Sequence, residues 1–207
     1  MNIIYLIFII LAFFFWLVFI ELLKPRYLVL LITFIAIISL TKIFFFQPYK
    51  IPAKSMVPTL LTGDHIIVNK FFYNMHDPLP GDVIIFELPR NPKQAFIKRI
   101  IGQPGDKIEI RSKALYINDK RIYEQYAINI DPQIIPPKTQ PRDFFGPINV
   151  PKNHLFMLGD NRDFSSDSRF WGFLPMEGVK GKVSYIYWSL DSENKKVRWK
   201  RIGKSVY

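Results

Sequence analysis

The chain has 207 residues, and its 28 Lys and Arg residues outnumber its 17 Asp and Glu residues, for a formal net charge of +11. This length corresponds to about one ordinary domain with attachments, and the absence of cysteine excludes disulfides, thiolate zinc sites and a cysteine nucleophile. A basic chain can bind nucleic acid or anionic lipid. Because it contains no nucleic-acid motif or basic arm, we expect no nucleic-acid partner and expect membrane lipid as a partner.

The first 46 residues carry almost no charge. Residues 3–20 form an unbroken apolar run that is long enough to cross a bilayer core as a helix, and residues 28–46 form a second run. The linker of residues 21–27 contains Lys24 and Arg26, whereas no Lys or Arg precedes residue 3, so the positive-inside rule places the linker in the cytoplasm. We therefore predict two N-terminal transmembrane helices within residues 1–46 and an extracytoplasmic domain over residues 47–207.

Two alternatives to these spans are weaker. A cleaved signal peptide at residues 1–20 would carry a basic n-region and a small-x-small site, and both are missing. A buried helical hairpin of a soluble protein would show a polar stripe, whereas these runs are apolar on all sides.

After residue 47 the pattern changes to short segments rich in β-branched and aromatic residues, separated by turns. The expected strands are residues 65–73, 82–88, 95–101, 107–111, 114–118, 154–158, 182–188 and 196–202. Gly-Asp pairs precede three of them, and Asn118-Asp119 is typical of a hairpin turn. The proline-rich residues 132–151 predict an extended surface loop. The pattern indicates a mostly β domain, barrel-like or sandwich-like.

Ser55 stands out because it lies in an apolar segment only nine residues beyond Phe46, at most about 30 Å of extended chain. A serine hydroxyl needs a base to become a nucleophile. The three histidines, His65, His76 and His154, do not lie in surroundings typical of a catalytic triad, although the sequence leaves open that one meets Ser55 in space.

Lys98 is the other candidate base. Strand alternation places Lys98 on one face of residues 95–101 and Arg99 on the other, and both faces look apolar. Lysine loses its proton readily when it is desolvated, whereas arginine does not, so only Lys98 could act as a base. The alternative is a solvated lysine of an edge strand.

Residues 158–173 form a polar segment between strands, which in part predicts Asx turns and an Arg–Asp pair. Its hydroxyls, Ser165 or Ser166, could orient a neutral lysine amine. Asp160 and Asp163 could be taken for metal ligands, but the segment has no histidine, and we expect no metal or other cofactor.

These motifs occur together and in order in one known family. The chain resembles the bacterial type I signal peptidases, or leader peptidases, in its two N-terminal apolar segments and in SMVPTL, PGDVIIF, FIKRIIGQPGD, GDNRDFSSDSRFWG and the C-terminal Arg201-Ile202-Gly203. The resemblance implies a serine endopeptidase that removes signal peptides from exported preproteins after a small residue. It also implies a multi-pass protein of the bacterial inner membrane, with the catalytic domain on the extracytoplasmic side near the export translocon.

The resemblance further implies roles for particular residues. Ser55 is expected as the nucleophile and Lys98 as the general base, with Ser165 hydrogen-bonded to the lysine. Supporting roles fall to Asp160, Arg162, Asp167 and Arg169. Shallow substrate pockets are expected to be lined by Tyr49, Ile51, Pro52, Ala53, Met56, Leu60, Phe96 and Ile97.

Two departures from the family pattern affect these expectations. Some members carry a hydroxyl residue two positions before the nucleophile that helps to hold the oxyanion, and here that residue is Ala53. Residues 107–150 also look short, which implies a reduced accessory β region.

The sequence leaves two rival functions to consider. A membrane-anchored β domain that only binds partners or lipid would share the apolar segments and the turns. A self-cleaving repressor-type protease would share the lysine, but it would not have two membrane segments and would have a DNA-binding one.

Overall fold

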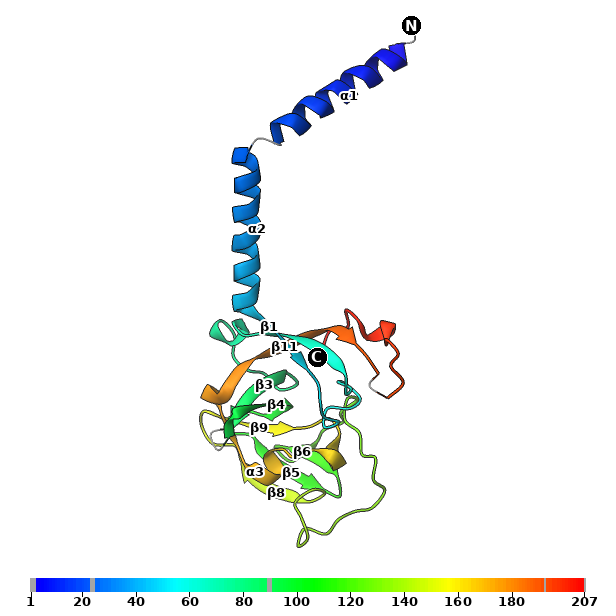
Figure 1. Ribbon diagram of the computed structural model, residues 1–207. Helices are drawn as coiled ribbons and strands as arrows, with labels where there is room; N and C mark the ends of the chain where they lie inside the picture. Colours follow the sequence, from blue (N-terminus) through cyan, green and yellow to red (C-terminus); the bar gives the residue numbers. More distant parts are fainter. Residues whose placement is uncertain (1–2, 23–24, 89–90, 192, 207) are drawn as a thin grey trace. The chain divides into compact units, whose positions relative to one another are not determined.

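The computed structural model describes residues 3–22, 25–88, 91–191 and 193–206, and the chain divides into two compact units, Met1–Phe45 and Phe46–Tyr207 (Figure 1). The first unit contains helices α1 (Ile3–Leu22) and α2 (Pro25–Phe45). Proline is tolerated at the first position of α2 because no intrahelical partner is needed there. The predicted linker, residues 21–27, is therefore mostly helical: residues 21–22 end α1 and residues 25–27 begin α2.

Among the described residues, no single helix reaches the length and hydropathy that a membrane crossing requires. The segments Phe13–Glu21 and Pro25–Ser39, which meet at a bend of 70°, reach them only together. The two separate transmembrane helices predicted from the sequence are thus left as a prediction.

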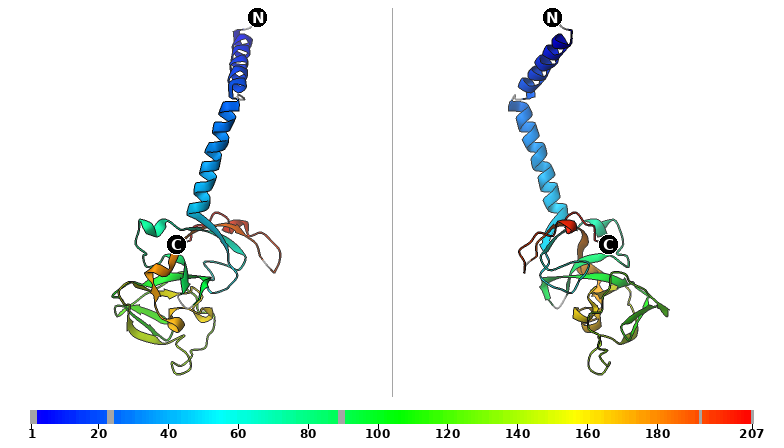
Figure 2. Two further views of the ribbon diagram at one scale, coloured as in Figure 1. Left: turned by 60° about the vertical axis from the view of Figure 1, so that its left-hand side comes forward. Right: turned by 90° about the vertical axis from the view of Figure 1, so that its right-hand side faces the viewer.

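The second unit is mostly β-structure, as predicted (Figures 1 and 2). Its larger sheet has seven strands, all paired antiparallel, in the order β1-β2-β11-β3-β4-β9-β10. Its strands are β1 (Phe46–Lys50), β2 (Asp64–Asn69), β3 (Val83–Leu88), β4 (Asn91–Gly102), β9 (His154–Leu158), β10 (Leu174–Pro175) and β11 (Val179–Ser189). The two edge strands β1 and β10 are not paired with each other, so the described strands form an open sheet and not a closed barrel.

A smaller sheet of four strands follows β4 in the chain, in the order β7-β6-β5-β8. Its strands are β5 (Lys107–Arg111), β6 (Ala114–Ile117), β7 (Lys120–Arg121) and β8 (Phe145–Asn149). It lies at the opposite end of the second unit from β1 (Figures 1 and 2). Short helical turns complete the unit: η1 (Phe72–Asn74), η2 (Arg162–Phe164), α3 (Ser168–Trp171), η3 (Met176–Gly178) and η4 (Trp199–Arg201).

The three Gly-Asp pairs that precede strands all form the same turn. Each glycine has a positive φ, between 89° and 94°, which glycine adopts without steric cost. In each turn the aspartate carboxylate then accepts a hydrogen bond from the backbone N–H three residues earlier, at 2.8 Å for Asp64, 3.2 Å for Asp82 and 2.9 Å for Asp106. The predicted turns are confirmed, and this local chemistry fixes where β2, β3 and β5 begin.

The predicted hairpin at Asn118-Asp119 is also confirmed, since both residues have positive φ, 52° and 65°, between β6 and β7. Two other expectations are wrong. Residues 132–151 are not entirely loop, because β8 pairs with β5 there. Residues 196–202 do not form a strand but contain η4, because only Val197 makes an isolated bridge, to Leu190.

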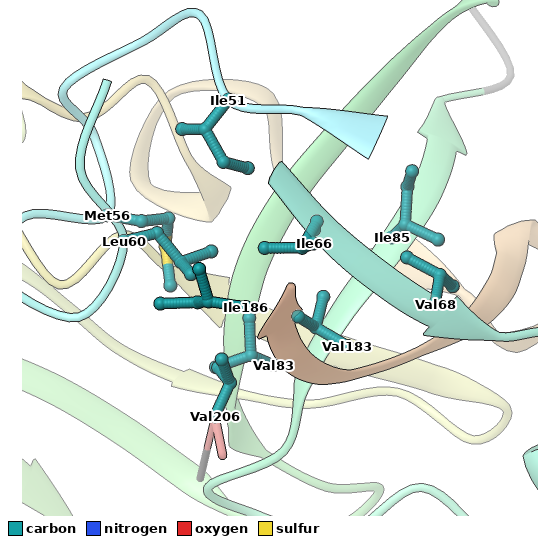
Figure 3. Packing of buried hydrophobic residues seen from close by; sticks show 10 residues of the cluster. All are labelled: Ile51, Met56, Leu60, Ile66, Val68, Val83, Ile85, Val183, Ile186 and Val206. Carbon is teal, nitrogen blue, oxygen red and sulfur yellow. The ribbon is translucent and has the colours of Figure 1, made fainter. Parts of the chain in front are cut away.

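Three hydrophobic clusters hold the second unit together. One joins β1, β2, β3 and β11 to the loop after β1 and includes Ile66, Val83 and Ile186, all fully buried (Figure 3). A second lies at the small sheet around Ile108, and a third lies around Ile84 and Phe86. Strand β4 contributes residues to the second and third clusters, with Ile97 packed against the first, which places its central residues among all three.

Candidate active site

Ser55 lies in the loop that joins β1 to β2, and the core fixes this loop. The Val57 N–H donates to the Lys54 carbonyl at 3.2 Å, which closes a turn around Ser55. Three apolar residues of the loop are buried in the first cluster: Ile51, Met56 and Leu60 (Figure 3). The loop is thereby held on both sides of Ser55.

Lys98 lies on β4, between β3 and β9, and is only 5% exposed. Its Nζ donates to Ser55 Oγ at 2.9 Å and to the Ile97 carbonyl at 3.1 Å. The sequence left open whether Lys98 or Arg99 points inward, and the structure buries both. Since only the amine can lose its proton, this contact can deliver a deprotonated serine.

Burial lowers the pKa of the Lys98 ammonium from its ordinary value of 10.5 to about 8. The nearby carboxylates of Asp167 and Asp160 act in the opposite direction, and the Arg169 guanidinium again lowers it. Both carboxylates are paired with arginines, which reduces the negative field at the amine. Desolvation therefore dominates, and a substantial share of the lysine is neutral near pH 8.

Arg99 holds Asp160 from the residue next to the lysine. Its Nε and Nη2 donate to the two oxygens of Asp160 at 2.9 and 2.7 Å, and both side chains are fully buried. Nη1 donates to the Gly81 carbonyl at 2.6 Å, and the guanidinium lies 3.9 Å from the ring centroid of Tyr126. A bidentate pair of this kind fixes orientation as well as distance, so Arg99 sets the position of the turn that begins at Asp160.

The predicted Arg–Asp pair within residues 158–173 is Arg169 with Asp167, joined at 2.8 Å through both Nε and Nη2. Arg162 has a partner outside the segment, the Glu124 carboxylate, at 2.6 and 2.8 Å. Arg169 also donates to the Arg162 carbonyl at 2.6 Å. The polar segment is therefore a set of buried ion pairs and not a solvated loop.

Sequence reasoning missed several residues of this network because their partners are distant in the chain. Glu124 lies 38 residues from Arg162, and Lys113 lies 50 residues from Asp163, to which its Nζ donates at 2.8 Å. Charge was the one sequence feature that could have indicated this network. An arginine stands beside the lysine, and acidic residues occur in a segment that lies between two apolar strands.

The expected hydrogen bond between Ser165 and Lys98 is not formed. The Ser165 Oγ is one of three buried side-chain polar atoms without a partner among the described residues, and Lys98 Nζ instead contacts Ser55 and the Ile97 carbonyl. Ser165 packs close to Gly159, where an added Cβ would lie 2.6 Å from Ser165 Cβ. The serine is at the site, but its hydroxyl is not used in this arrangement.

A cavity of about 320 Å³ lies beside the pair. The expected residues at this cavity are Ile51, Pro52, Ala53, Ser55, Met56, Phe96, Ile97 and Lys98. Three lining residues were missed: Gln94, Ala95 and Phe164. A fourth, Ser166, was expected only as a hydroxyl that could orient the lysine amine. The wall is mainly apolar, and the Ser55–Lys98 pair is on it.

Two expected pocket residues lie elsewhere. Leu60 is fully buried in the first cluster, where it holds the loop, and Tyr49 packs against the same cluster. Neither lines the cavity. Their apolar character in the sequence reflects the core, which the sequence alone did not separate from a pocket.

The histidines have their contacts away from Ser55. The His65 ring lies 5.7 Å from the Tyr187 ring and the His76 ring is stacked on Phe72 at 4.5 Å. His154 Nδ1 faces the Lys152 carbonyl at 2.8 Å. In the described part of the chain, no histidine is hydrogen-bonded to Ser55, so Lys98 is the base candidate that the geometry favours.

Known proteins give independent information on the class of this chain. Residues 21–188 match the family described as signal peptidase, peptidase S26. The probable signal peptidase I-1 of Synechocystis sp. is 32% identical over 86% of this chain and 86% of that protein. Signal peptidase I of Bacillus caldolyticus is 34% identical over 74% of this chain and 86% of that protein.

A third relative, the probable signal peptidase I-2 of Synechocystis sp., is 37% identical over 67% of this chain, and the match spans 61% of that protein's length. A solved signal peptidase I from Enterococcus faecalis V583 is 34% identical, with a TM-score of 0.42, over 52% of this chain and 97% of the solved chain.

These matches define the class of the protein as a peptidase. More specifically, the chain belongs to the signal peptidase S26 family, and the resemblance seen in the sequence motifs is confirmed.

Proposed function

We propose that this protein is a membrane-bound serine endopeptidase that removes signal peptides from exported preproteins, with Ser55 as nucleophile and Lys98 as general base. The observation that carries the proposal is the 2.9 Å contact between Lys98 Nζ and Ser55 Oγ, made by a buried lysine on the wall of an apolar cavity. Family membership supports the same reaction class.

The chemistry begins with a neutral Lys98. In that state its lone pair accepts the Ser55 proton, so that the hydroxyl oxygen attacks the substrate carbonyl and forms a tetrahedral intermediate. The amine then returns the proton to the leaving nitrogen, and an acyl-enzyme remains on Ser55. A water deprotonated by Lys98 releases the signal peptide, and Ser55 regains its proton.

The cavity supports the preference for small side chains. Ile51, Ala53 and Ile97 line the cavity beside Ser55, and a pocket that has room only for small side chains rejects large ones by steric clash. An extended peptide that fills this space would also keep water away from Lys98, which favours the neutral amine.

The first unit supports a membrane anchor. We propose that α1 and α2 are two spans joined on the cytoplasmic side by the short basic linker, and that the second unit faces outward at the bacterial inner membrane. Membrane lipids, signal-peptide-bearing preproteins and a nearby export translocon follow as partners. Restriction of enzyme and substrate to one surface would raise their effective concentration.

The proposal is tested with the full chain in detergent and a preprotein substrate, followed by sequencing of the new N-terminus. Ser55→Ala and Lys98→Ala are each expected to abolish cleavage. Ser184→Ala and Lys120→Ala serve as matched controls, because neither residue lines the cavity, and both are expected to cleave normally. Substantial turnover by either of the first two variants would refute the assignment.

A membrane-anchored β domain that only binds partners predicts a different result. A penem that acylates active serines would then fail to label the chain. If labelling occurs in the wild type and is lost in Ser55→Ala, the binding-only function is excluded.

A further inference from the structure

Asn161 lies directly against the loop that carries Ser55, and it contacts the backbone of this loop and not the Ser55 hydroxyl or the Lys98 amine. It is 3% exposed and comes from the turn that follows Asp160. Its side-chain Nδ2 donates to the Lys54 carbonyl at 3.1 Å, and its backbone N–H donates to the Ser55 carbonyl at 3.1 Å. One residue thus holds two consecutive peptide groups of the nucleophile loop.

The first of these peptide groups contains the Ser55 N–H. In a trans peptide the carbonyl and the N–H lie in one plane and point in opposite directions. A hydrogen bond that fixes the Lys54 carbonyl therefore also fixes the direction of the Ser55 N–H, and it polarises the N–H as a donor. Among the described residues the Ser55 N–H donates to no other group. It is available to an oxyanion.

The surroundings hold Asn161 rigidly. Ile128 brackets it, because the Ile128 N–H donates to the Asp160 carbonyl at 2.8 Å and the Arg162 N–H donates to the Ile128 carbonyl at 3.0 Å. The Asn161 Oδ1, by contrast, is buried and has no partner in the described part of the chain. An unsatisfied buried oxygen costs stability. The orientation of the Asn161 amide therefore preserves the hydrogen bond from Nδ2 to Lys54, while Oδ1 has no hydrogen bond of its own among the described residues.

We infer that Asn161 is a positioning residue that aims the Ser55 N–H at the oxyanion of the proposed reaction, and this inference rests on the proposed function. The aim of that donor matters here because Ala53 supplies no hydroxyl as a second donor. The Lys54 carbonyl also accepts from Val57 N–H, so removing the asparagine loosens the peptide plane without freeing it completely.

The test compares Asn161→Ala with wild type in the full chain, in detergent, on one preprotein from pH 7 to pH 9. We expect kcat to fall about 10- to 100-fold, below the full loss of an oxyanion donor, and KM to change by less than about twofold. The pH midpoint is expected to stay in place, since Lys98 keeps its contacts. Asn69→Ala is the matched control, because it removes one hydrogen bond between a side chain and the backbone, from Phe71 N–H at 3.0 Å, at the end of β2.

Asn161→Ser provides a second variant of smaller perturbation, with the same expected pattern. Unchanged kcat in a folded variant would overturn the inference, because the Ser55 N–H would then not depend on Asn161. A shifted pH midpoint would overturn it by assigning Asn161 to the dyad, and loss of folding in both variants would overturn it by assigning Asn161 to stability. The proposed function fails separately, if wild type does not cleave or if Ser55→Ala cleaves as well as wild type.

Discussion

Burial of Lys98 has a cost in stability that can be measured. The unfolded chain exposes the ammonium at its ordinary pKa of 10.5, whereas the folded protein lowers the pKa to about 8. The difference corresponds to about 3 kcal/mol against the charged form at pH 7. Lys98→Met keeps a similar unbranched side chain and removes the charge. We therefore expect this variant to be inactive but more stable than wild type, by up to about 3 kcal/mol at pH 7.

The sign of the pH dependence follows from the same difference. Between pH 8 and pH 10.5 the unfolded chain holds a proton on Lys98 that the folded protein has released, so wild-type stability rises with pH across this window. Above about pH 10.5 the lysine is neutral in both states and the cost disappears. The advantage of Lys98→Met is thus expected to be full below pH 8 and to vanish towards pH 10.5.

The measurement is urea unfolding of both full-length proteins in the same detergent, at pH 7 and at about pH 10. Tryptophan fluorescence monitors the unfolding. Lys98→Arg serves as a control that keeps a charge at every pH, and it is expected to be both inactive and less stable. A methionine variant less stable than wild type at pH 7, or a stability difference that does not change with pH, would refute the account of Lys98 as a desolvated amine.

Three further predictions follow from the site. The cleavage rate is expected to rise about tenfold between pH 7 and pH 9, because the neutral share of Lys98 grows from about a tenth to about nine tenths; a flat or falling kcat/KM profile would contradict a lysine base. Asp160→Asn leaves the buried Arg99 without its carboxylate and should lower the free energy of unfolding, measured in urea, by about 3–5 kcal/mol. A loss below about 1 kcal/mol would mean that the pair is solvated. Gly159→Ala would place a Cβ 2.5 Å from the Ser55 carbonyl oxygen, and the displaced serine should lower kcat by about a hundredfold; normal kcat would show that the loop can move aside.

Local chemistry made part of the fold predictable. The Gly-Asp turns and the Asn118-Asp119 hairpin follow from residues adjacent in the chain, so their positions could be read directly. The turn between β5 and β6 lies between two expected strands, but its conformation could not be predicted, since Ser112 and Lys113 adopt positive φ of 47° and 69° without glycine or asparagine. The pairing of β8 with β5, and the open form of the larger sheet, depend on contacts between distant segments that periodicity does not encode.

The site divides in the same way. Lys98 could be singled out because, of the two cations within residues 95–101, only the lysine can give up a proton. The partner of Asp160 could not, because Arg99 lies 61 residues away. Leu60 was mistaken for a pocket residue because apolar side chains look alike in the sequence whether they fill the core or line a cavity. The unused Ser165 hydroxyl depends on distances of a few ångström, which no sequence pattern supplies.

The salt links between the small sheet and the turn at residues 159–169 limit how far this protein can be trimmed. Lys113 and Glu124 both belong to the short region after β5, and each neutralises an ion of the turn, Asp163 and Arg162. Deleting that region to make a shorter protease would leave both charges buried without their partners. Any shorter version therefore has to replace those opposite charges, or exchange the ions themselves for apolar residues, before a strand is removed.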